Sequence, residues 1–313
     1  MGFAVPQSGS WATPDNQIEI ARAAEALGYH EVWTFQRLLY AAESTDARWS
    51  PVYRSVHDPL ITLAYLAAHT TRVRLGVAVL NLPWYAPLVL AKQLTTLDVV
   101  SGGRLDVGLG LGWAVEEYAA AGAPMTGRGR RADEFIACLR AVWGEGVVEH
   151  RGEFYEVPPS YVEPKPVQSP HPPLLLGGFA PAALARAGRF TDGWISSARA
   201  DFAALGTAVA TVRRAAKEAG RDPDALRFVC RGSIRLQPAG QPDRPPLTGS
   251  IDEVRRDFAD LAEQGMTELF VDLNFDPDIG SVDADPAVSM QRAREALEGF
   301  APRDSRPAQS SYE

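Results

Sequence analysis

The chain has 313 residues, which is enough for one large α/β domain or two smaller ones. Its formal net charge is −8 and its basic residues are scattered, so a nucleic-acid-binding surface is not expected. No apolar run reaches the roughly 18 residues that a membrane-spanning helix needs, and the N-terminus lacks the basic region and cleavage site of a signal peptide. We therefore expect a cytoplasmic globular protein that contacts no membrane, with Cys138 and Cys230 as buried, reduced thiols.

Strand-like and helix-like segments alternate through the first half of the chain. Four strands are predicted from apolar, β-branched runs, at residues 3–5, 31–35, 73–80 and 105–107. Each is followed by helix signals, which are Thr13 before Pro14, Asp58 before Pro59, and apolar stripes at 90, 94 and 97 and at 135, 139 and 142. Alternation of this kind is typical of a parallel sheet covered by helices.

The alternation is interrupted near the middle of the chain. Residues 147–149 and 154–156, joined around Gly152, predict a short hairpin. Residues 157–173 contain seven prolines and can form neither a helix nor a central strand. We expect an insertion at about residues 145–173 that runs over the surface, because the strand–helix pattern resumes at once.

The second half supplies four more predicted strands, at residues 174–176, 193–196, 227–236 and 269–271. Its helices include one with an apolar stripe at 205, 209, 212 and 216, and one that opens with a capping box from Ser250 to Glu253. A last helix is expected from Pro286 to Gly299. The predicted organisation is one domain over residues 1–300, followed by a frayed polar tail at 301–313.

Eight strand–helix repeats favour a single closed (β/α)8 TIM barrel of the α/β class. The alternative is an open doubly wound sheet, which needs phosphate-binding glycines after its first strand. Residues 7–10 read Gln-Ser-Gly-Ser and contain no G-x-G-x-x-G motif. Ligands of TIM barrels bind at the C-terminal ends of the strands, so the candidate site residues lie at those ends.

Glycine-rich segments follow two of the predicted strands. Residues 108–112 alternate glycine with leucine, either to let a flat ring approach the bare backbone or simply to let strands pack closely. Gly177 and Gly178 precede a helix that starts near Pro181. The N-terminus of that helix could bind a phosphate group through its free amides and partial positive charge. A plain strand-to-helix turn is the alternative.

Three segments carry a recognisable pattern in a fixed order: VRLGVAVLN at 73–81, LAKQLTTLD at 90–98 and SGGRLDVGLG at 101–110. Shorter stretches at 25–29, 176–178 and 191–194 extend the pattern over roughly residues 1–300. The chain resembles the bacterial luciferase-like family of flavin and deazaflavin enzymes. Within that family it looks closest to the actinobacterial branch that uses coenzyme F420.

The resemblance implies a TIM barrel with an inserted region, a homodimer, and a non-prolyl cis peptide at Ala78–Val79 that supports the rear face of the cofactor ring. It also implies that Gly177 and Gly178 hold the cofactor phosphate. The cofactor-binding residues that it predicts are Ala78, Val79, Asn81, Gly108, Gly110, Leu111, Gly177, Gly178 and Phe179.

The departures from the family pattern restrict the chemistry. Sugar-phosphate dehydrogenases of this family end the second strand with Asp-His and place a glutamate after the fourth-strand glycines, whereas this chain has Phe35-Gln36 and Trp113 there. Without a base, hydroxyl oxidation would forfeit a factor on the order of 10²–10⁴, so we do not expect that activity. The candidate catalytic residues that remain are Gln36, as a neutral hydrogen-bonding group, and Arg37, as a fixed cation.

Aromatic side chains are expected to wall the substrate pocket, namely Trp84, Tyr85, Trp113 and Trp194. Other interpretations stay open. Trp84 and Tyr85 could cover the barrel rim, and Arg37 could pair with Glu43. Glu116 and Glu117 could form an exposed helical turn. Arginines at 128, 130 and 131 are expected at a helix start, paired with Asp133 or Glu134 or facing an anionic cofactor tail. No residue spacing suggests a metal site.

Three functions are compatible with this pattern. The first is an oxidoreductase that transfers a hydride between coenzyme F420 and a small organic substrate, reducing an activated C=C, C=N or carbonyl group. The second is a monooxygenase that uses FMN, O2 and a partner flavin reductase. The third is a flavin-binding protein without turnover. The identity of the substrate does not follow from the sequence.

Overall fold

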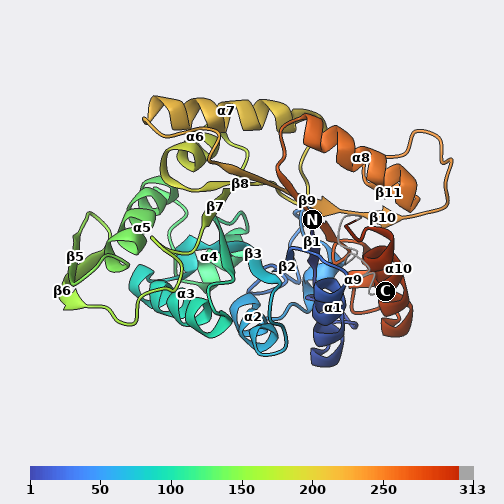
Figure 1. The fold of residues 1–313 in the computed structure, drawn as a ribbon, viewed down its shortest axis with the longest axis horizontal. Coiled ribbons are helices and arrows are strands. Elements are labelled where there is room, and N and C mark those ends of the chain that lie inside the picture. The colour runs from blue at the N-terminus through green and yellow to red at the C-terminus, as the bar shows by residue number, and fades with distance from the viewer. Residues whose placement is uncertain (303–313) are drawn as a thin grey trace, which may run out of the picture.

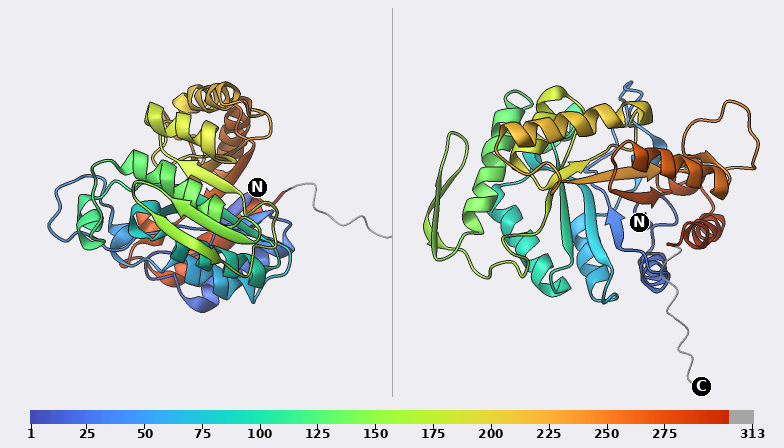
Figure 2. Two further views of the ribbon diagram at one scale, coloured as in Figure 1. Left: turned by 90° about the vertical axis from the view of Figure 1, so that its left-hand side faces the viewer. Right: turned by 45° about the horizontal axis from the view of Figure 1, so that its top comes forward.

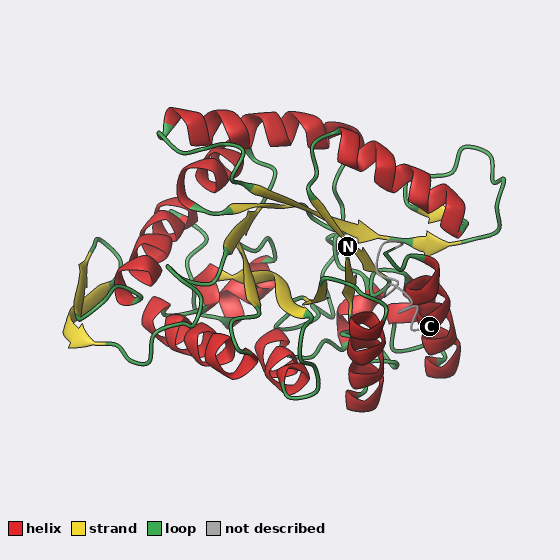
Figure 3. Ribbon diagram, viewed as in Figure 1, coloured by secondary structure: helices red, strands yellow, loops and turns green. Residues whose placement is uncertain are grey.

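Eight short apolar strands pair in parallel around a closed barrel in the order β1-β12-β9-β8-β7-β4-β3-β2. They form the centre of the computed structural model, which describes residues 1–302 (Figures 1 and 3). The strands are β1 (Gly2–Ala4), β2 (Glu31–Thr34), β3 (Arg74–Asn81), β4 (Leu105–Gly110), β7 (Leu174–Gly177), β8 (Gly193–Ile195), β9 (Arg227–Ser233) and β12 (Glu268–Asp272). This closed order confirms the TIM barrel and excludes the doubly wound sheet. The predicted tail beyond residue 302 lies outside the described residues.

Helices surround the barrel, as expected for strand–helix repeats (Figure 2). They are α1 (Pro14–Ala26), α2 (Pro59–Ala67), α3 (Pro87–Ser101), α4 (Val115–Ala120), α5 (Arg128–Val142), α6 (Pro181–Phe190), α7 (Leu205–Glu218), α8 (Ile251–Glu263), α9 (Pro277–Gly280) and α10 (Pro286–Gly299). The predicted caps are present: Thr13 caps α1, Asp58 caps α2, and Ser250 and Glu253 form a capping box. No helix within residues 1–302 is long and apolar enough to cross a bilayer.

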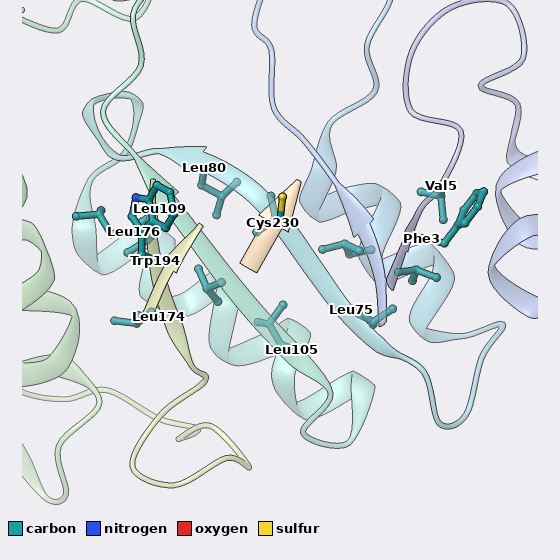
Figure 4. Close-up of a cluster of buried hydrophobic side chains, with 14 of the residues drawn as sticks. Phe3, Val5, Leu75, Leu80, Leu105, Leu109, Leu174, Leu176, Trp194 and Cys230 are labelled. Carbon is teal, nitrogen blue, oxygen red and sulfur yellow. The ribbon is translucent and has the colours of Figure 1, made fainter. Parts of the chain in front are cut away.

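Alternate residues of each strand face opposite sides, which gives the protein two apolar layers. The barrel interior holds a small cluster of buried side chains, namely Ala4, Trp33, Ala78, Leu175, Ile195, Val229 and Phe270. The larger layer lies between the barrel and its helices and contains Leu105, Leu109, Leu176 and Trp194 (Figure 4). Because Trp194 is fully buried in this outer layer, its prediction as a substrate-pocket wall is wrong.

Two small sheets lie outside the barrel. The predicted hairpin is present as β5 (Val147–Arg151) and β6 (Glu156–Tyr161), and the carboxylate of Glu134 in α5 accepts hydrogen bonds from three amides at its turn. The second sheet pairs β10 (Arg235–Leu236) with β11 (Thr248–Gly249) before α8. We expected one continuous strand over 227–236, but the chain leaves the barrel after Ser233.

The N-terminal end of the barrel contains a buried ionic cluster. The Asp106 carboxylate is fully buried, and it accepts hydrogen bonds from Arg74 at 2.7 and 2.8 Å and from Arg227 at 2.8 Å. Arg227 also pairs with Glu268 at 2.6 Å, and Glu31 lies 3.8 Å from the same guanidinium. These side chains connect five strands at the end of the barrel opposite to the expected ligand site, so we assign them to stability.

Candidate functional site

A bulge in β3 forms the floor of the candidate site at the C-terminal end of the barrel. The Ala78–Val79 peptide bond is cis, as the resemblance implied, and the pairing of β3 with β4 shifts register between Val77 and Leu80. Val79 is half-buried, whereas its neighbours in β3 are buried. The bulge therefore presents the Val79 side chain toward the mouth of the barrel.

The glycines of β4 make room for this bulge. A Cβ atom at Gly108 would lie 2.3 Å from the Val77 carbonyl oxygen, and one at Gly110 would lie 2.5 Å from Val79 Cγ2. The close-packing explanation thus accounts for Gly108 and Gly110, which are both buried in the barrel wall. Their role toward a cofactor is indirect, through the position of Val79.

Gln36 connects two strand ends beside the bulge. Its side-chain oxygen accepts a hydrogen bond from the Asn81 amide at 2.8 Å, and its side-chain nitrogen donates to the Tyr85 hydroxyl. Burial raises the pKa of Tyr85 to about 12, so this hydroxyl keeps its proton at neutral pH. The pair is a neutral polar group next to the floor of the site, with Tyr85 as the member that carries a transferable proton.

Arg37 forms a buried ion pair with a partner that we did not expect. Its guanidinium donates to Glu117 at 2.8 Å, and Glu117 also accepts from the Leu38 amide at 2.8 Å. The prediction of an exposed turn is wrong for Glu117, whose side chain is 0% exposed. Glu117, and not the suggested Glu43, is the carboxylate that pairs with Arg37. Burial raises the pKa of Glu117, and the charge of Arg37 opposes this shift. The pair joins the loop after β2 to α4.

An aromatic cluster surrounds the Arg37 guanidinium. The centroids of Tyr53, Trp113 and Trp49 lie 4.6, 4.8 and 5.6 Å from its central carbon. Cation–π contacts of this kind hold the guanidinium in one position. Trp113 is only half-buried. Its role as a wall of the substrate pocket stays a prediction.

Sequence reasoning missed Arg231 and Asp272. Arg231 lies within β9, where Nε donates to Asp272 at 2.7 Å and Nη1 donates to the Ala78 carbonyl at 2.9 Å. Asp272 ends β12 and is fully buried. A charged residue inside the apolar run Phe-Val-Cys-Arg, matched by an aspartate at the end of the next barrel strand, was the available signal.

A cavity of about 190 Å³ lies beside the mouth. We call it the side cavity. Its lining residues are Leu82, Pro83, Tyr85, Leu111, Ala121, Gly122, Ala123, Pro124, Arg128, Arg131, Ala132 and Tyr155. The lining holds two arginines and no carboxylate. Arg128 donates to the Gly112 carbonyl at 3.1 Å, whereas the buried Nε of Arg131 has no hydrogen-bond partner within residues 1–302.

The predicted arginine pairings are corrected by these contacts. Arg128 does begin α5, but Arg130 pairs with Glu153 at 2.7 Å, and Asp133 pairs with Arg186 at 2.5 Å. Neither Asp133 nor Glu134 neutralises the arginines of the side cavity. The cavity is therefore suited to an anionic group with an apolar neighbour.

Gly177 and Gly178 lead from β7 into α6, as predicted. Gly178 has a φ of +126°, and a Cβ atom there would lie 2.9 Å from the side chain of Ala183. The Trp194 indole donates to the Gly178 carbonyl at 2.8 Å, and Phe179 packs edge-on against the same indole. Trp194 thus supports this loop from behind. Within the described residues no side chain caps the N-terminus of α6, but Pro181 has no N–H group and the Ala183 amide donates to the Ala180 carbonyl at 2.8 Å.

Trp84 and Tyr85 are both half-buried, but only Tyr85 lines the side cavity. The two cysteines are buried and unpaired, as expected. Within residues 1–302 no group of three His, Cys, Asp or Glu side chains is arranged to hold a metal ion.

The closed barrel and the residues gathered at its C-terminal end define a TIM-barrel protein with a ligand site at the strand ends. The sequence pattern of the luciferase-like monooxygenase family matches residues 2–239. The chain therefore belongs to this enzyme family, which confirms the resemblance stated above.

Relatives of the chain include proteins with and without a described activity. An uncharacterized protein of Mycobacterium tuberculosis is 35% identical over 213 residues, which cover 65% of this chain and 72% of the relative. The FMNH2-dependent dimethylsulfone monooxygenase of Pseudomonas putida is 32% identical over 62% of this chain and 51% of its own. The oxygenase component of the flavin-dependent trigonelline monooxygenase of Acinetobacter baylyi is 32% identical over 53% of this chain and 44% of its own.

Solved structures show the same fold at low identity. A monooxygenase from Streptomyces bottropensis superposes with a TM-score of 0.76 at 24% identity, covering 96% of this chain and 98% of its own. An F420-dependent secondary alcohol dehydrogenase superposes with a TM-score of 0.76 at 16% identity, covering 95% and 98%. The relatives by sequence thus include flavin-dependent monooxygenases, and the proteins of the same fold include an F420-dependent enzyme.

Proposed function

We propose that this chain transfers a hydride between coenzyme F420 and a small organic substrate, and that it reduces an activated C=C, C=N or carbonyl group. The observation that carries this proposal is the pairing of an apolar floor at Val79 with an adjacent cavity lined by two arginines. A flat ring with an anionic tail needs these two environments side by side. When bound, F420 supplies the hydride-transfer chemistry at its ring.

The residues of the site fit such a cofactor. Val79 would support the ring, and the glycines at 177 and 178 leave space at the mouth where side chains would intrude. Arg128 and Arg131 would bind the anionic tail. Asn81 and Leu111 would frame the floor on either side. No carboxylate of the cavity lining opposes an anion.

The polar groups of the site favour reduction of an activated substrate over oxidation of an alcohol. Glu117 is held by Arg37 and by a backbone amide, so it is not a free base. Gln36 is neutral and orients the Tyr85 hydroxyl, which keeps its proton. Tyr85 would donate a hydrogen bond to an acceptor atom of the substrate, and the arrangement lacks a strong proton acceptor.

A second candidate function is an FMN-dependent monooxygenase that uses O2 and a partner flavin reductase. Two relatives above 30% identity favour it, because their names describe flavin-dependent monooxygenases. The two functions differ in their need for oxygen. Reduced F420 and a panel of enones, imines and aldehydes should give turnover in anaerobic buffer. Turnover that requires O2 and reduced FMN would instead identify a monooxygenase.

We also propose that two copies of the chain associate through α2 and α3, which pack side by side on the barrel (Figure 1). Their outer faces expose six large apolar side chains: Ile61, Tyr65, Leu88, Val89, Val99 and Val100. Exposed apolar side chains gathered on two neighbouring helices are typical of a protein–protein interface.

A double variant, Ile61→Glu with Val89→Glu, should convert the protein to a monomer, because it places charges on an interface that must exclude water. Light scattering after size-exclusion chromatography measures the change in mass. Val288→Glu on α10, which is also exposed, serves as the control and should leave the mass unchanged. A monomeric wild-type protein at about 50 μM would contradict the proposal, since a stable dimer has a Kd well below this concentration.

A further inference from the structure

Arg231 is a buried arginine whose contacts converge on the floor of the candidate site. Only 7% of its surface is exposed. Its Nη1 atom donates at 2.9 Å to the carbonyl of Ala78, the residue that precedes Val79 in the β3 bulge. Its Nε atom donates at 2.7 Å to Asp272, and Nη2 lies 2.7 Å from the same carboxylate oxygen. The guanidinium thus bridges β12 to the bulge across the barrel.

The partners of Arg231 are themselves held in place. The second oxygen of Asp272 accepts two hydrogen bonds from Asn274, at 2.9 Å each. Asn274 in turn accepts from the Gln7 amide at 2.8 Å and donates to the Val5 carbonyl at 3.0 Å. Rotation of the carboxylate would break its bonds to Asn274, which is itself bonded to the segment after β1.

Three aromatic rings enclose the guanidinium. The centroids of Phe275, Phe35 and Phe270 lie 4.3, 5.0 and 5.8 Å from its central carbon. A planar guanidinium can bond to a carbonyl and a carboxylate at once while it stacks on rings, and a lysine ammonium cannot do this. A buried ion pair is a poor means of stabilising a barrel when apolar side chains would fill the same space. Its contact with the bulge suggests another role.

We infer that Arg231 is a positioning residue for cofactor binding. It fixes the Ala78 carbonyl and thereby holds Val79 in the place where the ring of the cofactor packs. Asp272 and Asn274 set the orientation of Arg231. This inference rests on the proposed function, because it requires that a ring bind against Val79.

The test compares two arginines of the same strand. Arg231→Met removes the bond to Ala78, and Arg227→Met removes ion pairs at the opposite end of the barrel, where the arginine side chain is 24% exposed. The measurements are the melting temperature, the Kd for F420 and for FMN, and the visible absorption spectrum of the bound cofactor. Arg231→Met should raise the Kd at least tenfold and change the spectrum of the bound ring. Arg227→Met should lower the melting temperature and leave the Kd within twofold of wild type.

Arg231→Lys provides a variant that keeps the charge. It should remain folded and bind the cofactor with an intermediate Kd, because an ammonium can reach only one of the two partners. A folded Arg231→Met or Arg231→Lys protein with the wild-type Kd and spectrum would overturn the inference. If the wild-type protein binds neither cofactor, the proposed function fails first. If the wild-type protein binds a cofactor and the Arg231 variants bind it with the same Kd and spectrum, the inference fails and the proposed function stands.

Discussion

Replacing Asp106 by asparagine should lower the free energy of unfolding by about 3–5 kcal/mol, because it removes the fully buried carboxylate that Arg74 and Arg227 share. Asp106 is fully buried and is bonded to both Arg74 and Arg227. Chemical denaturation at neutral pH measures the loss. The exposed pair of Arg130 and Glu153 provides the control, since Glu153→Gln removes an ion pair of similar length but should change stability little.

The effect of the Asp106 substitution should depend on pH. Burial raises the pKa of this carboxyl, but the two arginines outweigh burial and hold it at about 2. A lowered pKa in the folded state contributes stability above the ordinary value of about 3.9, and this contribution disappears as the pH falls toward 2. The stability difference between wild type and Asp106→Asn should therefore shrink below about pH 4. A difference that is constant from pH 7 to 3 would show that the carboxylate charge is not the cause.

Glu31 should show the opposite dependence. It is buried beside Asp106, and burial together with that neighbouring carboxylate raises its pKa well above the ordinary value. A raised pKa contributes stability at low pH, and this contribution is lost as the pH rises through the folded-state pKa. Glu31→Gln imitates the protonated form, so its advantage over wild type should grow with increasing pH. Denaturation curves at pH 5, 6.5 and 8 measure this trend.

Arg131→Met should raise the Kd of the cofactor by about 10- to 100-fold, in line with the loss of one hydrogen bond to a charged group. The Nε atom of Arg131 is buried and has no hydrogen-bond partner among residues 1–302, and its guanidinium packs 4.2 Å from the centroid of Phe154. The side chain is thus already oriented toward the side cavity before an anion binds. Titration followed by tryptophan fluorescence measures the Kd at two salt concentrations.

Arg130→Met is the matched control for this prediction. Arg130 is the neighbouring residue of α5, but it is exposed, pairs with Glu153 and does not line the cavity. Its replacement should leave the Kd within twofold of wild type. If the two variants bind the cofactor equally well, the side cavity is not where the anionic tail lies.

The barrel could be predicted because its signals are local. Strand runs, the caps at Thr13, Asp58 and Ser250, and the family pattern at residues 73–110 each lie within a few neighbouring residues. The pairing of β10 with β11 was missed, because each strand is two residues long and β11 carries no apolar alternation.

The sequence predicts which candidate site residues lie at strand ends, but it does not predict which partners their side chains contact. Gln36, Arg37 and the glycines at 177 and 178 follow from their positions at strand ends. The partner of Arg37 could not be predicted in this way, because Glu117 lies 80 residues away. Two adjacent glutamates, Glu116 and Glu117, are also typical of an exposed helical turn. Arg231 contacts Ala78 across 153 residues. Trp194 was misplaced because a one-residue difference along a strand moves a side chain from the barrel mouth to the outer layer.

Parallel titrations of the apo-protein with oxidised F420 and with FMN, followed by tryptophan fluorescence, test the central claim most directly. The account predicts a micromolar Kd for F420 and weaker binding of FMN. It further predicts that the F420 affinity falls in Arg131→Met and not in Arg130→Met. Tight binding of FMN with no saturable binding of F420 would contradict the claim and assign the chain to the oxygen-dependent branch of its family.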